Sequence, residues 1–380
     1  MRDDPDHVYY KDSMKPRGEV IILGGGVIGL TTAYFLAKAG VSVVVCEQGQ
    51  IGMEASWAGA GILPPSDPDH AQLPLDCLRA LSGTLFPELS NELHERTGID
   101  NGFVRCGGLE FLIQAMNTDA GEWYGLGVRT HILAEKETVV VEPEIAPELG
   151  KARHIPGMAQ LRNPRHLQAL RQACLHTNKV AFLEEAGSLG FTTEKNRIKG
   201  IRTTNETVMG GTFLVAAGAW TDRLLEPLGC RLNIQPVRGQ IALLNPGEML
   251  FRHILICGSR YLVPRLDGRV LIGSTEEHVG FTKAVTAAGM SGLLELGVRL
   301  VPRLASAPVE KTWSGLRPGS PDGLPFLGPV PGVDNLYVAA GHFRAGIQLS
   351  PGTAQVITEM ILGQPLSMPM DAFRLDRKLD

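Results

Sequence analysis

Three kinds of feature are scarce in this 380-residue chain, and each scarcity narrows what the protein can be. The six cysteines are scattered, with no C-x-x-C pair and no metal-ligand spacing, so neither a metal centre nor a disulfide framework is expected. No run of about 18 apolar residues occurs, which predicts no membrane-spanning helix. With 36 basic and 40 acidic residues, the net charge of -4 offers no basic surface for nucleic acid or anionic lipid. We expect a globular protein of a reducing, cytoplasmic compartment.

The chain is long enough for two packed domains, because 380 residues exceed a comfortable single core. Residues 1–18 are acidic and lack the apolar stretch of a secretory signal, so they are expected to form a flexible tail. Glycine, in contrast, is abundant, with 45 residues. This abundance indicates several places where the backbone must pass close to another group.

The stretch "EVIILGGGVIGLTTAYFLAKAGVSVVVCEQG" has the pattern of a dinucleotide-binding unit. A buried strand at 19–23 leads into a G-x-G-x-x-G turn, followed by a helix from Val27 to about Ala39, a second strand at 41–46 and then Glu47. The three glycines of the turn are Gly24, Gly26 and Gly29.

Each part of this unit has a mechanical reason. The first glycine allows a tight turn, the second lets backbone approach a pyrophosphate, and the third lets helix and strand pack closely. The helix N-terminus offers N–H groups to the phosphates, and Glu47 is placed to accept hydrogen bonds from a ribose. The alternative is a glycine-rich turn without a ligand, which the register of strand, helix, strand and acid makes the weaker reading.

The residues after Glu47 favour FAD over a nicotinamide cofactor. The run Ala58-Gly59-Ala60-Gly61 suits backbone lying against a flat, extended ligand. A second set of small residues, at 217–219, follows the predicted strand "TFLV". A second G-x-G-x-x-G, which would hold NADPH, is missing from the sequence.

The chain resembles the D-amino-acid oxidase superfamily of FAD enzymes and, within it, the glycine oxidases of thiamine biosynthesis. The resemblance runs from residue 19 to about 375 and is carried by the motifs "IILGGGVIGL", "ASWAGAGIL", "LRNPRHL", "VAAGAW", "PVRGQ", "RYLVPRLDGRVLIGSTEEH", "WSGLRPGSPDGLPFLGPVPG" and "AAGHFRAGIQLSPGTA". The pair "GLRPGSPDG" and "GHFRAGI" is the most specific of these motifs.

Two arginines stand in segments rich in glycine and proline, which predict rigid loops near strand ends. A guanidinium binds an amino-acid carboxylate through two parallel, charge-assisted hydrogen bonds. By resemblance, Arg317 is the carboxylate-binding arginine, and Arg344 is a second arginine of the active site. The alternative for Arg317 is a structural ion pair, with Asp322 as the obvious partner.

Tyr261 lies in two short predicted strands joined by the hairpin turn Asp267-Gly268. The resemblance implies that its hydroxyl donates to the substrate carboxylate, whereas the simpler reading is an aromatic residue on a strand face. His342 could be a base but is expected to be structural, since relatives require no protein base at the reacting carbon. No protein acid or base is therefore assigned.

The pattern and the resemblance together assign the contacts to FAD. The expected cofactor-binding residues are Gly24, Gly26, Val27, Ile28, Gly29, Glu47, Gln48, Ala55, Ser56, Ala60, Gly61, Ile62, Leu189, Ala217, Gly218, Trp220, His342, Phe343, Arg344, Ala345, Gly346, Ile347 and Gln348. The helix after "GHFRAGI" would direct the positive end of its dipole at the flavin ring. No cysteine lies between Leu316 and Gln348, so FAD is expected to be bound non-covalently.

The resemblance implies oxidative deamination of glycine to glyoxylate, ammonia and hydrogen peroxide, with O₂ as electron acceptor and the glycine imine used for thiazole synthesis. It also implies a homo-oligomer, a tetramer in relatives. Two alternatives remain: a dehydrogenase of D-amino acids or secondary amines that reduces a quinone, and a non-catalytic flavin-binding protein. Ala345 and Glu276 depart from the family pattern, so sarcosine or a small D-amino acid could replace glycine.

The expected fold is α/β, or α+β overall, with a Rossmann-like FAD-binding domain interleaved with a smaller antiparallel-sheet substrate domain. Residues 19–90, 155–225 and 312–375 are assigned to the FAD-binding domain. Residues 91–154 and 226–311 are assigned to the substrate-binding domain, in part because "QPVRGQIALL" reads as a strand.

Overall fold

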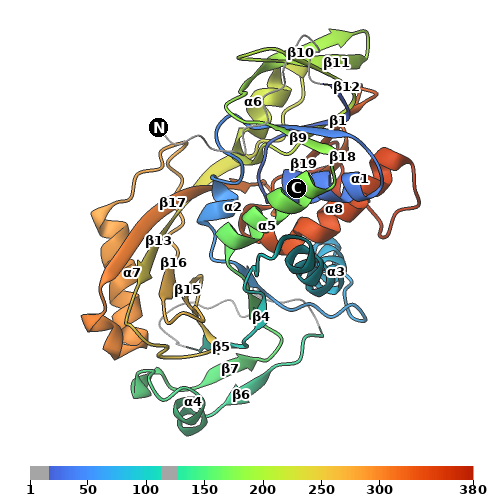
Figure 1. The fold of residues 1–380 in the computed structure, drawn as a ribbon. Helices are drawn as coiled ribbons and strands as arrows, with labels where there is room; N and C mark the ends of the chain where they lie inside the picture. Colours follow the sequence, from blue (N-terminus) through green and yellow to red (C-terminus); the bar gives the residue numbers. More distant parts are fainter. Residues whose placement is uncertain (1–16, 113–126, 380) are drawn as a thin grey trace.

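The computed structural model describes residues 17–112 and 127–379 (Figure 1). Most of the predicted N-terminal tail therefore lies outside the described residues, and the first strand begins at Arg17, two residues earlier than expected. Within the described ranges, no helix has both the length and the apolar character needed to cross a bilayer.

The first sheet is built on parallel strands in the order β9, β2, β1, β12 and β19. β18 pairs antiparallel with β19, and the hairpin β10–β11 joins β12. The bounds are β1 Arg17–Leu23, β2 Val43–Cys46, β9 Val180–Leu183, β10 Ser188–Glu194, β11 Arg197–Thr203, β12 Thr207–Val215, β18 Phe326–Pro329 and β19 Leu336–Ala340.

The two faces of this sheet enter different cores, because successive side chains of a strand point to opposite sides. Val20 and Ile22 of β1 pack with four helices, α1 Val27–Lys38, α3 Pro74–Thr97, α5 Asn163–His176 and α8 Gly346–Leu362. Ile21 and Leu23 pack on the other side with β11 and the short helix α6 Thr221–Leu225. This is the predicted dinucleotide-binding architecture, with helices against a mainly parallel sheet.

The second sheet has the order β17, β13, β16, β15, β14, β5, β7 and β6, and its pairs are antiparallel except for β14 with β5. Helix α7 Ala287–Leu300 covers one face, and the other face turns toward the first sheet (Figure 1). The bounds are β5 Gly108–Phe111, β6 His131–Leu133, β7 Ala152–Ile155, β13 Gln235–Leu244, β14 Ile254–Cys257, β15 Arg260–Pro264, β16 Val270–Gly273 and β17 Val309–Gly319.

Smaller elements connect the two sheets. β3 Ile62–Leu63, β8 Ala159–Gln160 and β4 Val104–Arg105 form a three-stranded sheet. The short helix α2 Ala55–Ala58 packs against β17, and α4 Glu135–Val141 lies beside β6. The α/β fold with a second, antiparallel sheet is therefore confirmed, as is the predicted hairpin, in which Gly268 adopts φ +85°.

One segment differs from its prediction. Residues 314–319, expected to be a loop of the FAD-binding domain, form the end of β17 in the second sheet. β17 is an edge strand whose ladder partner is β13. Pro318 has no N–H to donate, and an edge strand tolerates a proline because its outer side forms no ladder hydrogen bonds. Pro236 of β13 stands directly opposite Pro318. Pairing with β13 continues to Gly319, and the domain boundary at residue 312 stays a prediction.

Candidate active site

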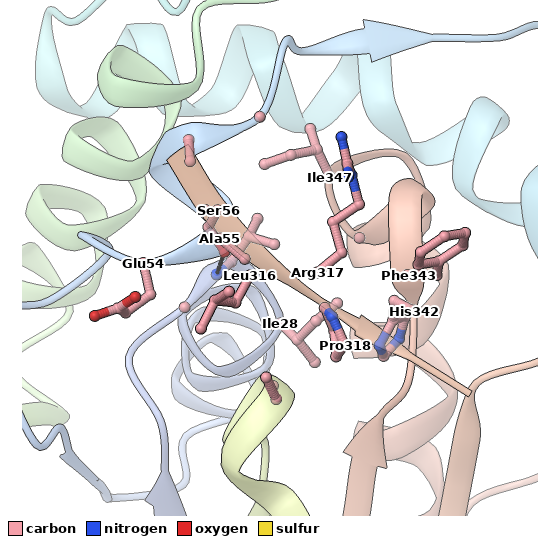
Figure 2. A pocket seen from close by; sticks show the side chains of 18 of the residues that line it. Ile28, Glu54, Ala55, Ser56, Leu316, Arg317, Pro318, His342, Phe343 and Ile347 are labelled. Carbon is pink, nitrogen blue, oxygen red and sulfur yellow. Dashed lines mark hydrogen bonds between the residues drawn. The ribbon is translucent and has the colours of Figure 1, made fainter. Parts of the chain in front are cut away.

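A cavity of about 850 Å³ lies where the two sheets meet. Figure 2 shows that its wall is built from parts of the chain that are far apart in sequence, including Ile28 and residues of 54–56, 316–318 and 342–347. The β1–α1 turn and the 216–220 segment after β12 also line it. Because the segments after β1, β2, β12 and β19 follow the carboxyl ends of parallel strands, the cavity occupies the usual ligand position of an open α/β sheet.

The glycine turn leaves space that no other residue could leave. Gly24 has φ +111°, and a Cβ there would lie 2.4 Å from the carbonyl oxygen of Ala216. A Cβ on Gly29 would lie 2.0 Å from the carbonyl oxygen of Gly24, so this glycine permits the contact between helix α1 and strand β1. Gly26 precedes the first residue of α1, and the Val27 N–H donates to Ser56 Oγ at 2.9 Å.

Glu47 lies at the end of β2 and is buried in the cavity wall. Its carboxylate accepts from the Gly25 N–H at 2.8 Å and from the Gly49 N–H at 3.0 Å. These bonds hold the side chain in one orientation beside the turn. A carboxylate has about four lone-pair sites, so capacity remains for a ribose hydroxyl.

Arg317 extends from β17 across the cavity-facing side of β13. Its side chain lies over Gly239, where a Cβ would come within 2.3–2.5 Å of the guanidinium. Nη2 donates to Ser274 Oγ at 2.6 Å and Nη1 donates to the carbonyl oxygen of Thr275 at 3.2 Å. The alternative pairing with Asp322 is wrong, because Asp322 accepts two hydrogen bonds from Arg377.

The burial of Arg317 lowers the pKa of its guanidinium, and Tyr261, which is also buried, opposes that change. An arginine nevertheless remains a cation in a protein. Tyr261 stands on β15 with its ring against Gly273 of β16, where a Cβ would lie 2.7–2.8 Å from the ring and hydroxyl atoms. The two predicted carboxylate-binding residues therefore line one part of the cavity, with glycines making room for both.

Arg344 lines the cavity from the segment between β19 and α8. Its Nε donates to Glu276 Oε2 at 3.1 Å, and its Nη2 donates to the same oxygen. Glu276 follows β16 in the sequence and also lines the cavity. The second predicted arginine is thus held by the residue that departs from the family pattern.

His342 is buried in the wall and has a structural partner. Its Nε2 lies 3.1 Å from Thr353 Oγ1, on helix α8. Burial lowers the pKa of His342 to about 3, so the imidazole is neutral near pH 7. Helix α8 begins at Gly346, and the residues before and after its start line the cavity, which brings the helix N-terminus to the ligand.

Most of the predicted site residues line this one cavity. Two do not. Gly29 lies behind the turn, in the packing role described above, and Leu189 is exposed, whereas Ala186, Gly187 and Ser188 stand in the wall. A contact between Leu189 and adenine therefore remains a prediction.

Sequence reasoning missed two residues that shape the wall. Asn163, in the quoted motif "LRNPRHL", donates from Nδ2 to the carbonyl oxygen of Ser56 at 2.7 Å, and its position before a helical proline could have singled it out. Arg265 is buried and donates to the carbonyl oxygens of Ala60 and Leu161 at 2.7 and 2.9 Å. No local pattern marks it, because its acceptors are distant in sequence.

The segment 274–286, which we call the bridging loop, runs from β16 to α7 and is attached to both sides of the cavity. Glu277 bonds to Arg238 of the second sheet. Phe281 packs on Trp220, with ring centroids 5.5 Å apart, and Lys283 pairs with Glu54 at 2.8 Å. The loop therefore joins the second sheet to the dinucleotide-binding side and carries Glu276 into the cavity.

The residues present fit FAD. The cavity combines a glycine turn at a helix N-terminus, an acidic residue after β2 and a second helix N-terminus at α8. Gly61 has φ +71°, and a Cβ there would meet the Leu161 carbonyl oxygen at 2.1 Å, so backbone forms the wall at this point. This long cradle, with apolar walls and few polar groups, suits an extended dinucleotide with a flat ring.

Comparison with known proteins gives the same result. A family model described as FAD dependent oxidoreductase matches residues 19–360. The chain is 37% identical to a glycine oxidase of Pseudomonas putida, covering 92% of this chain and 96% of the relative. It is 34% identical to the glycine oxidase of Geobacillus kaustophilus, covering 96% of this chain and 98% of the relative.

Solved structures agree with these relatives. The crystal structure of glycine oxidase from Geobacillus kaustophilus superimposes with a TM-score of 0.90 at 33% identity, covering 96% of this chain and 100% of that one. The expectation of an FAD enzyme is confirmed, and the chain belongs to the FAD-dependent oxidoreductase family, of the D-amino-acid oxidase type.

Proposed function

We propose that the protein is a glycine oxidase that converts glycine, water and O₂ to glyoxylate, ammonia and hydrogen peroxide. The supporting observation is the position of Arg317, a half-buried cation that faces the same cavity as the glycine turn. Relatives of matching length are named glycine oxidases, at 34–37% identity. When bound, FAD supplies the oxidation by accepting two electrons from the substrate.

The residues of this chain bind and orient the substrate. Arg317 and the Tyr261 hydroxyl receive the carboxylate, and the bonds from Arg317 to Ser274 and Thr275 keep the guanidinium from turning away. A clamp that is already ordered lowers the entropic cost of aligning the substrate Cα. His342 is neutral and bonded to Thr353, so its proposed role is to hold the chain before α8 rather than to move a proton.

The enzyme's product is proposed to serve thiazole synthesis. The chain is 30% identical to a Nostoc protein named bifunctional protein ThiO/ThiG and covers 94% of its own length but 55% of that relative. In such a role the imine formed from glycine would be consumed before hydrolysis. Glycine as the preferred substrate, rather than sarcosine or a small D-amino acid, is part of the proposal.

The cellular compartment and the oligomeric state are proposals as well. None of the six cysteines, all of which lie in the described residues, forms a disulfide bond, and this supports a reducing compartment such as the cytoplasm. A homo-oligomer, tetrameric by resemblance, is expected and can be measured by light scattering of the purified protein.

A single assay tests the proposed function. The purified, FAD-loaded protein is mixed with glycine, sarcosine or D-alanine under air, while flavin absorbance and peroxide are recorded. Peroxide formation with glycine is the expected result. Bleaching without peroxide would favour the quinone-dependent dehydrogenase, and no bleaching with any amine would favour a flavin-binding protein without this activity.

A further inference from the structure

The cavity contains an ion pair between Arg344 and Glu276 in addition to the carboxylate clamp. Glu276 of the bridging loop and Arg344 before α8 line the same cavity as Arg317. Arg344 directs two donors, Nε and Nη2, at one oxygen of Glu276. Both side chains keep roughly a third of their surface exposed, 35% for Arg344 and 37% for Glu276, so the pair lies at the open side of the cavity.

Both members of the pair act on Arg317. Burial is the largest influence that lowers the pKa of the Arg317 guanidinium; Arg344 lowers it further, and Glu276 raises it. Arg317 donates to the carbonyl oxygen of Thr275, the residue before Glu276, and Glu276 accepts from Arg344, so the three charges form one electrostatic unit. A ligand held by Arg317 will interact with all three.

The charge of this unit follows by counting. Arg317 and Arg344 contribute two positive charges and Glu276 contributes one negative charge, so the unit has a net charge of +1. Of the other charged residues of the cavity wall, Glu54 pairs with Lys283 and Arg79 pairs with Asp76. Glu47 accepts from the N–H groups of Gly25 and Gly49, and the Arg223 guanidinium lies over the Phe281 ring. A ligand with one carboxylate matches the unit, whereas a ligand with two carboxylates exceeds it by one negative charge.

We propose that Glu276 makes this cavity selective for amino acids that carry a single carboxylate, by neutralising Arg344 and repelling a second acidic group. The proposal rests on the proposed function and names the substrate class of the same site. Because about two thirds of each side chain of the pair is covered, solvent screens an unmatched charge there less than it does in bulk water. Specificity of this kind comes from a repulsive group as much as from an attractive one.

Two ligands of equal shape separate charge from size. Malonate and malonamate have the same heavy-atom arrangement, but at pH 8 malonate carries two negative charges and malonamate carries one. The FAD-loaded protein is titrated with each, and the perturbation of flavin absorbance gives a dissociation constant without any turnover. The measured quantity is the ratio of the two constants.

The wild-type protein is expected to bind malonamate more tightly than malonate. The Glu276→Gln variant should lower that preference by about tenfold, because its charged unit has two positive charges. Glu276→Asp keeps the charge and should keep the preference. Glu310→Gln removes one negative charge from the start of β17, outside the cavity wall, and should also keep it.

Arg344→Gln provides a second test that does not depend on the folding of Glu276→Gln. It leaves Glu276 uncompensated, so the preference for malonamate should increase. An unchanged ratio in Glu276→Gln or in Arg344→Gln, or a wild-type protein that binds both ligands equally, would overturn the proposal. Glycine turnover of the same wild-type preparation is recorded separately, so a failure of the oxidase assignment is distinguishable from a failure of charge selectivity.

Discussion

Arg317 donates a hydrogen bond to Ser274 at 2.6 Å, and this bond links the edge strand β17 to the start of the bridging loop. The guanidinium also donates to the Thr275 carbonyl oxygen, so two successive loop residues hold it. Gly239 lies beneath it and leaves the space that it fills. The orientation of the proposed clamp is therefore set before any substrate arrives.

Replacement of Arg317 by methionine removes the cation while keeping much of the side-chain volume. We expect kcat/KM for glycine to fall by at least about 100-fold, because a charged, desolvated contact is worth roughly 2–5 kcal/mol. Steady-state peroxide assays measure the change, and the flavin spectrum confirms that the variant still binds FAD. Arg317→Lys is the comparison, since it keeps the charge but loses the planar fork. Unaltered turnover and affinity in Arg317→Met would refute the proposed binding mode.

Replacement of Ser274 by alanine tests the support of the clamp. The Arg317 side chain loses one hydrogen bond but keeps its charge and its bond to Thr275. We expect KM for glycine to rise by about 5- to 10-fold, since a hydrogen bond to a charged group contributes roughly 1.5–3 kcal/mol at most. Ser274→Thr keeps the hydroxyl and should stay closer to wild type. Equal kinetics for Ser274→Ala and the wild type would show that the bond does not orient Arg317.

Replacement of Gly29 by alanine tests the packing of α1 on β1. The new methyl group would lie 2.0 Å from the Gly24 carbonyl oxygen, so helix and strand must separate. We expect a loss of stability of about 2 kcal/mol or more, with weaker FAD retention. Gly49→Ala is the matched control, because its Cβ meets no atom within 4 Å. Thermal unfolding of both variants measures the difference, and similar melting temperatures would contradict the packing role.

Acidification should destabilise the protein through its buried imidazoles. Burial lowers the pKa of His166 to about 4, whereas an unfolded histidine titrates near 6.5. The unfolded state therefore binds more protons between about pH 6.5 and pH 4, and stability falls as pH falls through this window, by up to roughly 1.4 kcal/mol per pH unit. Urea unfolding of wild type and His166→Gln at several pH values checks this. The variant should show a shallower slope; an identical slope would exclude His166 as a contributor.

Sequence patterns predicted those parts of the molecule whose determinants are local. The glycine turn, the strands on either side of α1 and the β15–β16 hairpin depend on neighbouring residues, and each is found where it was expected. Arg317 was assigned to the cavity through its motif, but its strand was read as a loop. Pairing with β13 is a long-range contact, and it outweighs the local signal of Pro318.

The partners of the predicted residues were less accessible to sequence reasoning. Glu276 was noticed as a departure from a pattern, yet its pairing with Arg344 joins residues 68 positions apart. Arg265 and its carbonyl acceptors, Ala60 and Leu161, are similarly distant. Such contacts depend on how two sheets pack, which periodicity and turn propensity do not encode.

The bridging loop has a consequence for the size of molecule that this enzyme can admit. Glu276, Phe281 and Lys283 attach the loop to the dinucleotide-binding side. The two sheets therefore cannot separate by a hinge motion without breaking all three contacts. We expect entry of the substrate to the cavity near Arg317, and release of the product from it, to depend on the rotation of individual side chains. Such an entrance suits a small free metabolite and would exclude an amine attached to a peptide or a polymer.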